Sequence, residues 1–288
     1  MRPYERVCSR ATSSRVRWLL ILMVVASCER TGRAPEAQGA QARLVTLSPS
    51  ATEVVAALGA TAQLVGVDQY STYPPEVSKL TKVGSFLSPN IETIVSLRPT
   101  LVILDDIHGG TATVLKDAGV ATVACPMHGL PDVKRGLRSV AQQIGRAAEA
   151  ERLIGEIDAA LDAASARRPA RRPRVLAVID RQKDGLGNLV GAGPGSWIDE
   201  LLAVVGGQNV LAASSVKYPK ISMEEVLRAQ PEFILDLSYA ARDEITAWQA
   251  ADVPASKTGR VRALSEPYLV APSPRVTAAL DVLARSLQ

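Results

Sequence analysis

The chain has 288 residues, enough for one large domain or two modest ones, and 47% of them are hydrophobic while 22% are charged. This composition is typical of a globular protein and contains no low-complexity block that would prevent a core. The net charge of +4 would suggest a nucleic-acid partner, but eight Arg and three Glu fall within residues 1–43. The other 245 residues carry 25 basic and 26 acidic groups, so we expect no nucleic-acid partner for the folded part.

The first 27 residues have the pattern of a secretory signal peptide. Several Arg precede the apolar run WLLILMVVA at 18–26, which is too short to cross a bilayer of about 30 Å as a helix. The sequence VASC at 25–28 resembles the processing box of bacterial lipoproteins, in which the cysteine receives a lipid. We therefore expect an exported, periplasmic lipoprotein, lipidated at Cys28 and tethered to a membrane by residues 28–43. Ordinary cleavage beside an incidental cysteine is the alternative.

Cysteine use fits an exported chain that has no disulfide pair. Cys8 lies in the segment that cleavage removes, and Cys28 is the expected lipid site. Cys125 lies alone in an apolar stretch, so we expect a buried free thiol there. A folded part of about 245 residues is large enough to be stable through its core alone.

Residues 44–131 alternate short apolar runs with helical patterns. We predict strands at 44–47, 64–67, 100–104 and 121–125, and helices at 50–59 and 111–119. Ser50 and Glu53 have the spacing of a capping box, and Gly59 and Gly119 are suited to end the two helices. This alternation predicts an N-terminal α/β lobe with a doubly wound parallel sheet.

Residues 132–166 have one long helical pattern, in which apolar residues mostly recur at steps of three or four. Gly145 and two further glycines weaken such a helix only modestly, so we expect one continuous connecting helix. The run ARRPARRPR at 166–174 follows it. Because no aromatic residues interleave with this basic run, we interpret it as a solvated linker and not as a nucleic-acid patch.

Residues 174–288 form a second α/β lobe by the same criteria. Strands are predicted at 174–180 and 233–237, and helices at 196–207, at 242–250 and from 274. Two lobes joined by one long helix leave a cleft between them. Clefts of this kind are favoured ligand sites.

Four aromatic residues fall in loops that are expected to border this cleft. Tyr70 follows a predicted strand, Phe86 lies in VGSFLSPN, Tyr218 lies in KYPK and Tyr268 lies in EPYLVAPSP. Loops after parallel strands line the ligand site of doubly wound lobes, so the set predicts an aromatic cleft for a large flat ligand. For each ring taken singly, simple loop packing is the alternative.

A catalytic site is not evident in the sequence. The Gly-rich segment GAGPGSW at 191–197 lacks P-loop and dinucleotide spacing, and we expect a tight loop that presents Trp197 beside the cleft. The two histidines, His108 and His128, have no metal-ligand spacing, and there is no GxSxG motif. We expect no enzyme, no metal and no cofactor, with His108 as a solvated loop residue; contact of His108 with a ligand or a metal is the alternative. The alternatives are an exported α/β enzyme that uses the cleft and His108, and a scaffold without a ligand.

Two segments 132 residues apart repeat one pattern: NIETIVSLRPTLVIL at 90–104 and ISMEEVLRAQPEFIL at 221–235. Asn90 and Ser222 are good N-caps, and each begins a short helix that ends before a proline and a strand. Glu92 and Glu224 fall in the first turns, where a carboxylate complements the helix dipole by about 0.3–1 kcal/mol. That role suffices for each carboxylate alone. One carboxylate at the matching place of each lobe also suits docking onto a two-fold partner with two basic sockets.

These segments, together with RLVTLSPSATEVVAALGA, LVGVDQYSTYPPEVSKLTKVGSF and GPGSWIDELLAVVGGQNV, resemble the periplasmic vitamin B12-binding proteins. Those proteins belong to a wider family of substrate-binding proteins that serve ABC importers for B12, haem and ferric siderophores. The resemblance covers residues 44–288. It implies two Rossmann-like lobes bridged by one long helix, the class III or helical-backbone architecture, with little hinge closure.

The resemblance also implies specific roles for residues of this chain. Glu92 and Glu224 match the pair that engages arginines on the permease dimer, which works with its ATPase. Tyr70, Phe86 and Tyr218 match positions around the corrin of B12 binders, while Asp105 stands where a Trp occurs in one of them. We expect a monomer that holds a corrinoid, with Asp105, Trp197 and Tyr268 also in the site. Haem and ferric siderophores are the alternative ligands.

Overall fold

The computed structural model describes residues 42–239 and 245–288. The signal peptide, Cys28 and nearly all of the tether lie outside these residues, as does the first part of the helix predicted at 242–250. Within the described ranges, no helix is both long enough and apolar enough to span a membrane.

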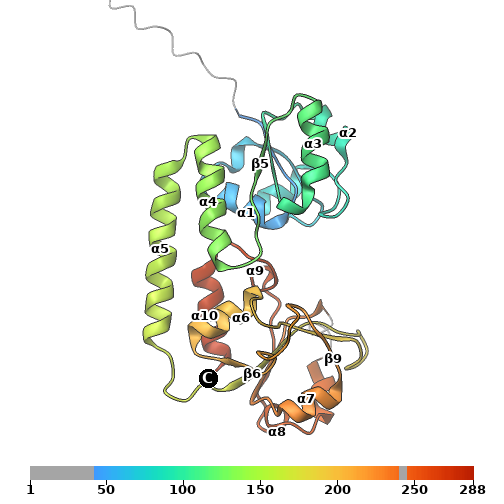
Figure 1. The fold of residues 1–288 in the computed structure, drawn as a ribbon, viewed down its shortest axis with the longest axis vertical. Coiled ribbons are helices and arrows are strands. Elements are labelled where there is room, and N and C mark those ends of the chain that lie inside the picture. The colour runs from blue at the N-terminus through green and yellow to red at the C-terminus, as the bar shows by residue number, and fades with distance from the viewer. Residues whose placement is uncertain (1–41, 240–244) are drawn as a thin grey trace, which may run out of the picture. The chain divides into compact units, whose positions relative to one another are not determined.

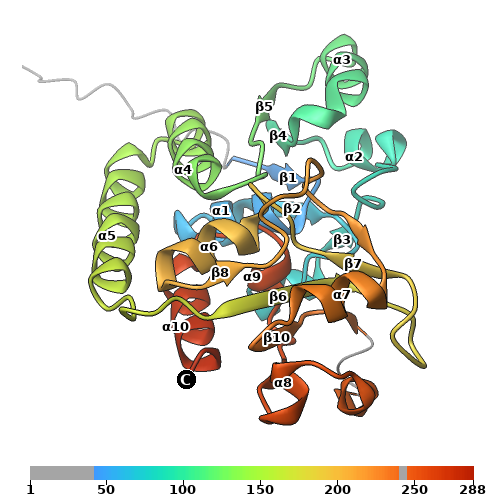
Figure 2. The same ribbon diagram turned by 60° about the horizontal axis from the view of Figure 1, so that its bottom comes forward.

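The sheet of the N-terminal lobe, which Figure 1 shows beside α4, contains five parallel strands among the described residues. Their order is β3-β2-β1-β4-β5, as labelled in Figure 2. The strands are β1 Leu44–Thr46, β2 Leu64–Val67, β3 Thr81–Lys82, β4 Leu101–Leu104 and β5 Thr122–Ala124. Apolar runs form the central strands because both faces of a parallel sheet are buried, as at Val45 and Val102. The four predicted strands are confirmed, and the two-residue β3 is an addition.

The helices of this lobe are α1 Pro49–Ala57, α2 Ile91–Ser96 and α3 Gly109–Asp117, with 3-10 turns η1 Thr61–Gln63, η2 Pro75–Lys79 and η3 Asp106–His108. The predicted capping box at the start of α1 is wrong. Ser48 is the N-cap, and its hydroxyl accepts a hydrogen bond from the Ala51 backbone N–H at 3.1 Å. Glu53 is instead directed to the other lobe, where it pairs with Arg275. Gly59 ends the helix with φ of +70°, as expected.

The predicted connecting helix at 132–166 is two helices, α4 Leu130–Ile144 and α5 Ala147–Ala166. Gly145 adopts a left-handed conformation with φ of +70° and caps α4, so the prediction of one continuous helix is wrong. The 20 residues of α5 form the long helix that connects the lobes, about 30 Å at 1.5 Å per residue (Figure 1). It contacts α4 of the first lobe and also α6 and α10 of the second lobe.

The second lobe has the strand order β11-β10-β6-β7-β9, and β8 pairs with β6. Its strands are β6 Arg174–Asp180, β7 Leu189–Gly191, β8 Gln208–Asn209, β9 Lys220–Ile221, β10 Phe233–Asp236 and β11 Val261–Ala263. Its helices are α6 Trp197–Val205, α7 Met223–Ala229, η5 Ile245–Ala250, α8 Pro254–Lys257, α9 Pro267–Val270 and α10 Val276–Ser286. β6, β8, β10 and β11 are parallel, while β7 and β9 extend the sheet in antiparallel pairs.

The basic run that follows α5 is bound to the second lobe through hydrogen bonds that its arginines donate. The Arg168 Nε donates to the carbonyl oxygen of Val204 at 2.9 Å, at the end of α6. A guanidinium nitrogen of Arg174 donates to the carbonyl oxygen of Ala229 at 2.6 Å, at the end of α7. Cations at helix C-termini satisfy free carbonyl groups and oppose the helix dipole. The linker is therefore a structural part of the lobe.

The repeated sequence pattern reflects repeated topology. β1-β4-β5 and β6-β10-β11 have the same order and direction, and a short helix precedes β4 in one lobe and β10 in the other. Asn90 and Ser222 cap these helices, α2 and α7, through hydrogen bonds of 2.9 and 3.2 Å. Glu92 and Glu224 are both exposed. Figures 1 and 2 show α2 and α7 on the side away from α5.

Candidate ligand-binding cleft

A pocket of about 320 Å³ lies between the two lobes, at the lower end of the range of about 300–1,000 Å³ for ligand sites. The N-terminal lobe contributes the segments that follow β1, β4 and β5, which is where doubly wound sheets bind ligands. The second lobe contributes the loop before β9 and the segment after α9. The lining consists of Ser48, Pro49, Ser50, Phe86, Asp105, Ile107, Met127, His128, Tyr218, Val270, Ala271 and Pro272.

Three of the predicted ligand residues meet in this lining: Phe86, Asp105 and Tyr218. Tyr70 is 62% exposed and Tyr268 is half-buried against the core, and neither belongs to the lining. Contact of these two tyrosines with a ligand stays a prediction. Phe86 and Tyr218 come from opposite lobes, so the pocket has an aromatic side chain on each side.

The prediction that Trp197 lines the cleft is wrong. Trp197 is 1% exposed within the main core, and its indole N–H donates to the Tyr268 carbonyl oxygen at 2.9 Å. Trp197 begins α6 directly after the N-cap Ser196, and its position on the apolar face turns it inward. A buried indole needs a hydrogen-bond acceptor, and the α9 backbone supplies one.

The Gly-rich loop before α6 supports the aromatic side of the cleft. A side chain at Gly193 would lie 2.4 Å from the Val216 carbonyl oxygen, and the Gly193 N–H donates to the Lys217 carbonyl oxygen at 2.8 Å. The loop therefore holds the segment that carries Tyr218. The Asp199 carboxylate accepts the Gly195 N–H at 2.9 Å, which occupies a donor that a bound anion would need.

His108 is buried, so the prediction of a solvated loop histidine is wrong. Its Nδ1 accepts the Asp105 backbone N–H at 3.1 Å, which makes Nε2 the protonated nitrogen, and Nε2 donates to the Phe86 carbonyl oxygen at 2.6 Å. The two rings also meet edge to face at 5.0 Å. His108 is thus neutral and positions the Phe86 loop. The spacing of Asp105 and His108, a capping box around η3, was the available sequence signal.

Asp105 is 3% exposed at the end of β4 and is held from both sides. Its two carboxylate oxygens accept backbone N–H groups of Ile107 at 3.3 Å and of Met127 at 3.2 Å. Burial raises the pKa of Asp105, and a hydrogen bond shared with Asp106 raises it further. The same hydrogen bond, followed by that from His128, lowers the pKa of Asp106. Adjacent carboxylates therefore compete for one proton at the pocket wall.

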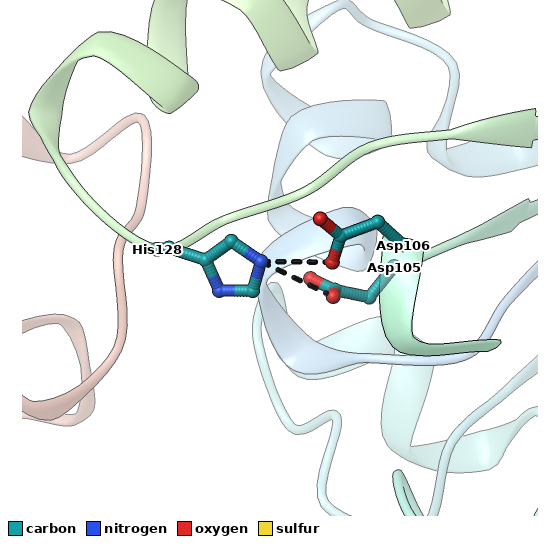
Figure 3. A group of neighbouring side chains, drawn as sticks. All are labelled: Asp105, Asp106 and His128. Carbon is teal, nitrogen blue, oxygen red and sulfur yellow. Dashed lines mark hydrogen bonds and ion pairs between the residues drawn. The ribbon is translucent and has the colours of Figure 1, made fainter.

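His128 faces this carboxylate pair (Figure 3). Its Nε2 lies 2.9 Å from Asp106 Oδ1 and 3.5 Å from Asp105 Oδ1. This group was not predicted from the sequence, because 22 positions separate His128 from Asp106. The signal that was available is that the residues follow β4 and β5, which are adjacent parallel strands.

An ion pair below the pocket joins the lobes. The Glu53 carboxylate of α1 accepts hydrogen bonds from the Arg275 guanidinium, one of them at 2.8 Å, and from the Ser273 hydroxyl. The Arg275 guanidinium lies 4.0 Å from the ring centre of Tyr73 and 4.4 Å from that of Tyr268. These five residues, named here the interlobe clamp, fix the two walls of the pocket relative to each other.

Two α/β lobes, a connecting long helix and an aromatic pocket at the strand ends define a class III ligand-binding protein. Residues 44–268 match the family described as periplasmic binding protein, and the chain belongs to this family. Members of this family are substrate-binding proteins of transport systems.

Characterised relatives and solved structures agree with this assignment. The chain is 34% identical over 200 residues to the vitamin B12-binding protein of Salmonella typhimurium, covering 67% of this chain and 71% of the relative. The periplasmic vitamin B12-binding protein of Vibrio cholerae superposes with a TM-score of 0.67 at 27% identity, over 85% of this chain and 96% of that structure. The periplasmic haem-binding protein of Roseiflexus sp. RS-1 has a TM-score of 0.73 at 32% identity, over 86% and 100%.

Proposed function

We propose that the chain is the substrate-binding protein of an ABC importer and captures cobalamin or a related corrinoid between its lobes. The observation that carries this proposal is the pocket lined by Phe86 from one lobe and Tyr218 from the other. Aromatic faces on two sides suit a large flat macrocycle, because stacked rings contribute beyond the apolar area they bury. The vitamin B12-binding relatives favour a corrinoid, and the haem-binding neighbour keeps haem as the second candidate.

The function consists of capture and delivery, without chemistry. His108, the candidate for an exported enzyme, has both ring nitrogens in hydrogen bonds to the backbone. A general base needs a ring nitrogen that is free to take a proton from the substrate, and both nitrogens of His108 are occupied in this arrangement.

Ligand identity is tested by equilibrium dialysis of the full chain, purified in mild detergent, against cyanocobalamin, haemin and a ferric siderophore. We expect saturable binding of cyanocobalamin, weakened at least tenfold by Phe86→Ala or Tyr218→Ala, since an aromatic anchor contributes more than about 1.4 kcal/mol. Val114→Ala is the control, because Val114 is exposed on α3 outside the pocket. If only haemin binds, the ligand is haem and not a corrinoid. If none of the three compounds binds, the proposed function is refuted.

Docking to the permease is assigned to Glu92 and Glu224. Both carboxylates are exposed at the starts of matching helices, and neither has an ion-pair partner within the part of the chain that the structure describes. We expect Glu92→Lys with Glu224→Lys to abolish uptake in cells that depend on this protein, with unchanged corrinoid affinity. Asp117→Lys with Asp162→Lys changes the charge equally at other exposed helix positions and serves as the control. Normal uptake by the first pair would eliminate the docking role.

Membrane attachment is assigned to a lipid on Cys28. Metabolic labelling with radioactive palmitate should mark the unchanged protein and leave a Cys28→Ser variant unlabelled, and we expect the processed protein to be a monomer. Cys8→Ser is the matched control, because Cys8 lies in the leader that processing removes. Palmitate labelling of the Cys28→Ser protein would contradict lipidation at this residue.

A further inference from the structure

Asp105, Asp106 and His128 form a cluster with the spacing of a metal site. One ligand atom from each residue can be chosen so that all three lie within 4.8 Å of one another. The His128 Nε2 lies 2.9 and 3.5 Å from the two carboxylate oxygens (Figure 3). Ligands about 2.0–2.2 Å from a shared ion are separated by about 2.9–3.5 Å in octahedral or tetrahedral geometry. The two separations from the His128 Nε2 therefore fall within the range for ligands of one ion.

The cluster is preorganised on rigid elements. Asp105 is buried, and each of its oxygens accepts one backbone N–H, which leaves lone pairs on both. Asp106 begins η3 beside it, and His128 follows the adjacent strand β5. Asp106 and His128 are exposed, so an ion can enter from solvent.

Within residues 42–239 and 245–288, no lysine or arginine forms an ion pair with the two carboxylates of the cluster. Among the described residues, His128 is the only basic side chain in an ion pair with Asp105 or Asp106. The Lys217 ammonium group lies nearby but donates to the His128 carbonyl oxygen at 2.8 Å. Two neighbouring carboxylates repel each other, and a bound cation removes this repulsion.

We propose that Asp105, Asp106 and His128 bind one divalent first-row transition-metal ion, such as Zn²⁺ or Mn²⁺, at the wall of the cleft. One imidazole and two carboxylates suit borderline divalent ions, and three protein ligands leave coordination positions open. Asp105 and His128 both line the pocket, so the proposed site borders it. An ion there presents positive charge to a phosphate or carboxylate of the cargo, a step that rests on the proposed function.

The test uses the ligand-free full chain, stripped of metal with a chelator and titrated with Co²⁺ or Zn²⁺ alone. We expect one ion per chain by calorimetry and a visible Co²⁺ absorption band that changes when the imidazole is removed. His128→Gln and Asp106→Asn should each weaken binding at least tenfold, because each removes a ligand atom. Asp117→Asn, at an exposed carboxylate on α3, should bind as the unchanged protein does. Asp105→Asn is avoided because Asp105 is buried.

Absence of saturable metal binding would overturn the proposal, as would equal affinity and an equal Co²⁺ band in the His128→Gln protein. The outcome is separable from the proposed function because no organic ligand is present. If the chain binds no metal but binds the corrinoid normally, only the proposed metal site is refuted. Metal binding without corrinoid binding overturns only the corrinoid assignment. Corrinoid affinity that is the same with and without Zn²⁺ would refute contact between ion and cargo.

Discussion

Removal of one partner from the interlobe clamp should destabilise the protein strongly. Arg275→Met keeps an unbranched apolar side chain between Tyr73 and Tyr268 but removes the charge that Glu53 faces. Glu53 then remains buried with the hydroxyl of Ser273 as its hydrogen-bond partner in the clamp. An uncompensated buried carboxylate is the main cause of the expected loss.

The magnitude follows from the burial of the pair. Removing one member of a buried ion pair costs about 3–5 kcal/mol, and the lower end applies because the Arg275 side chain is 22% exposed while that of Glu53 is 9% exposed. A loss of about 3 kcal/mol in the free energy of unfolding lowers the Tm of a protein of this size by about 6–12 °C. Substituting both partners should cost less than the sum of the single changes, since no buried charge is then left alone.

Thermal unfolding followed by circular dichroism measures these shifts. Arg138→Met is the matched control, because Arg138 and Glu151 form an ion pair whose side chains are 52% and 59% exposed. Exposed pairs contribute little, so the Tm of this control should stay near that of the unchanged protein. An Arg275→Met protein that unfolds within about 1 °C of the control would refute the reasoning about burial.

Three further predictions concern the core and the helices. Trp197→Phe should lower the free energy of unfolding by about 1 kcal/mol or more, because the hydrogen bond to the Tyr268 carbonyl oxygen is lost. The corrinoid affinity measured by dialysis should be unchanged, and a weakened affinity would indicate that Trp197 contacts the ligand. Burial raises the pKa of Cys125 to about 12, so only about one thiol in 10,000 is ionised at pH 8. Mass spectrometry should find the Cys125 peptide alkylated only after unfolding, and labelling of the folded protein would contradict this. Gly145→Ala should lower the free energy of unfolding by about 1 kcal/mol because φ at Gly145 is +70°. Gly155→Ala, inside α5, should raise it slightly. Urea midpoints that shift in the same direction for both variants would contradict the backbone argument.

The regular part of the fold was predictable because its signals are local. The strand predicted at 174–180 coincides with β6, and the N-caps Asn90 and Ser222 were identified from residue type and spacing. β7 and β9 were missed because they contain three and two residues, too few for a periodic pattern. The break between α4 and α5 at Gly145 was missed because a glycine inside a helix costs only about 1 kcal/mol. Tertiary packing can outweigh a cost of this size, so the glycine alone does not predict whether the helix ends there.

Site residues whose environment depends on distant segments were predicted less well. Phe86 and Tyr218 were identified as cleft residues from their loops, and both line the pocket. Trp197 was misassigned because its acceptor lies 71 positions away, and nothing beside it in the sequence indicates burial. Glu53 was read as a local cap, although its partner lies 222 positions away. Local spacing predicts caps and strands, but long-range packing decides which polar groups are buried.

Each sheet of this protein is built from one continuous part of the chain, residues 44–124 for the first and 174–263 for the second. During assembly each half can therefore form its own hydrogen-bond ladders without waiting for the other. The bond between Glu53 and Arg275 closes a loop of more than two hundred residues, which makes it entropically a late event. We therefore expect the binding pocket to form after the two sheets, when the segment that carries Arg275 packs against the first lobe.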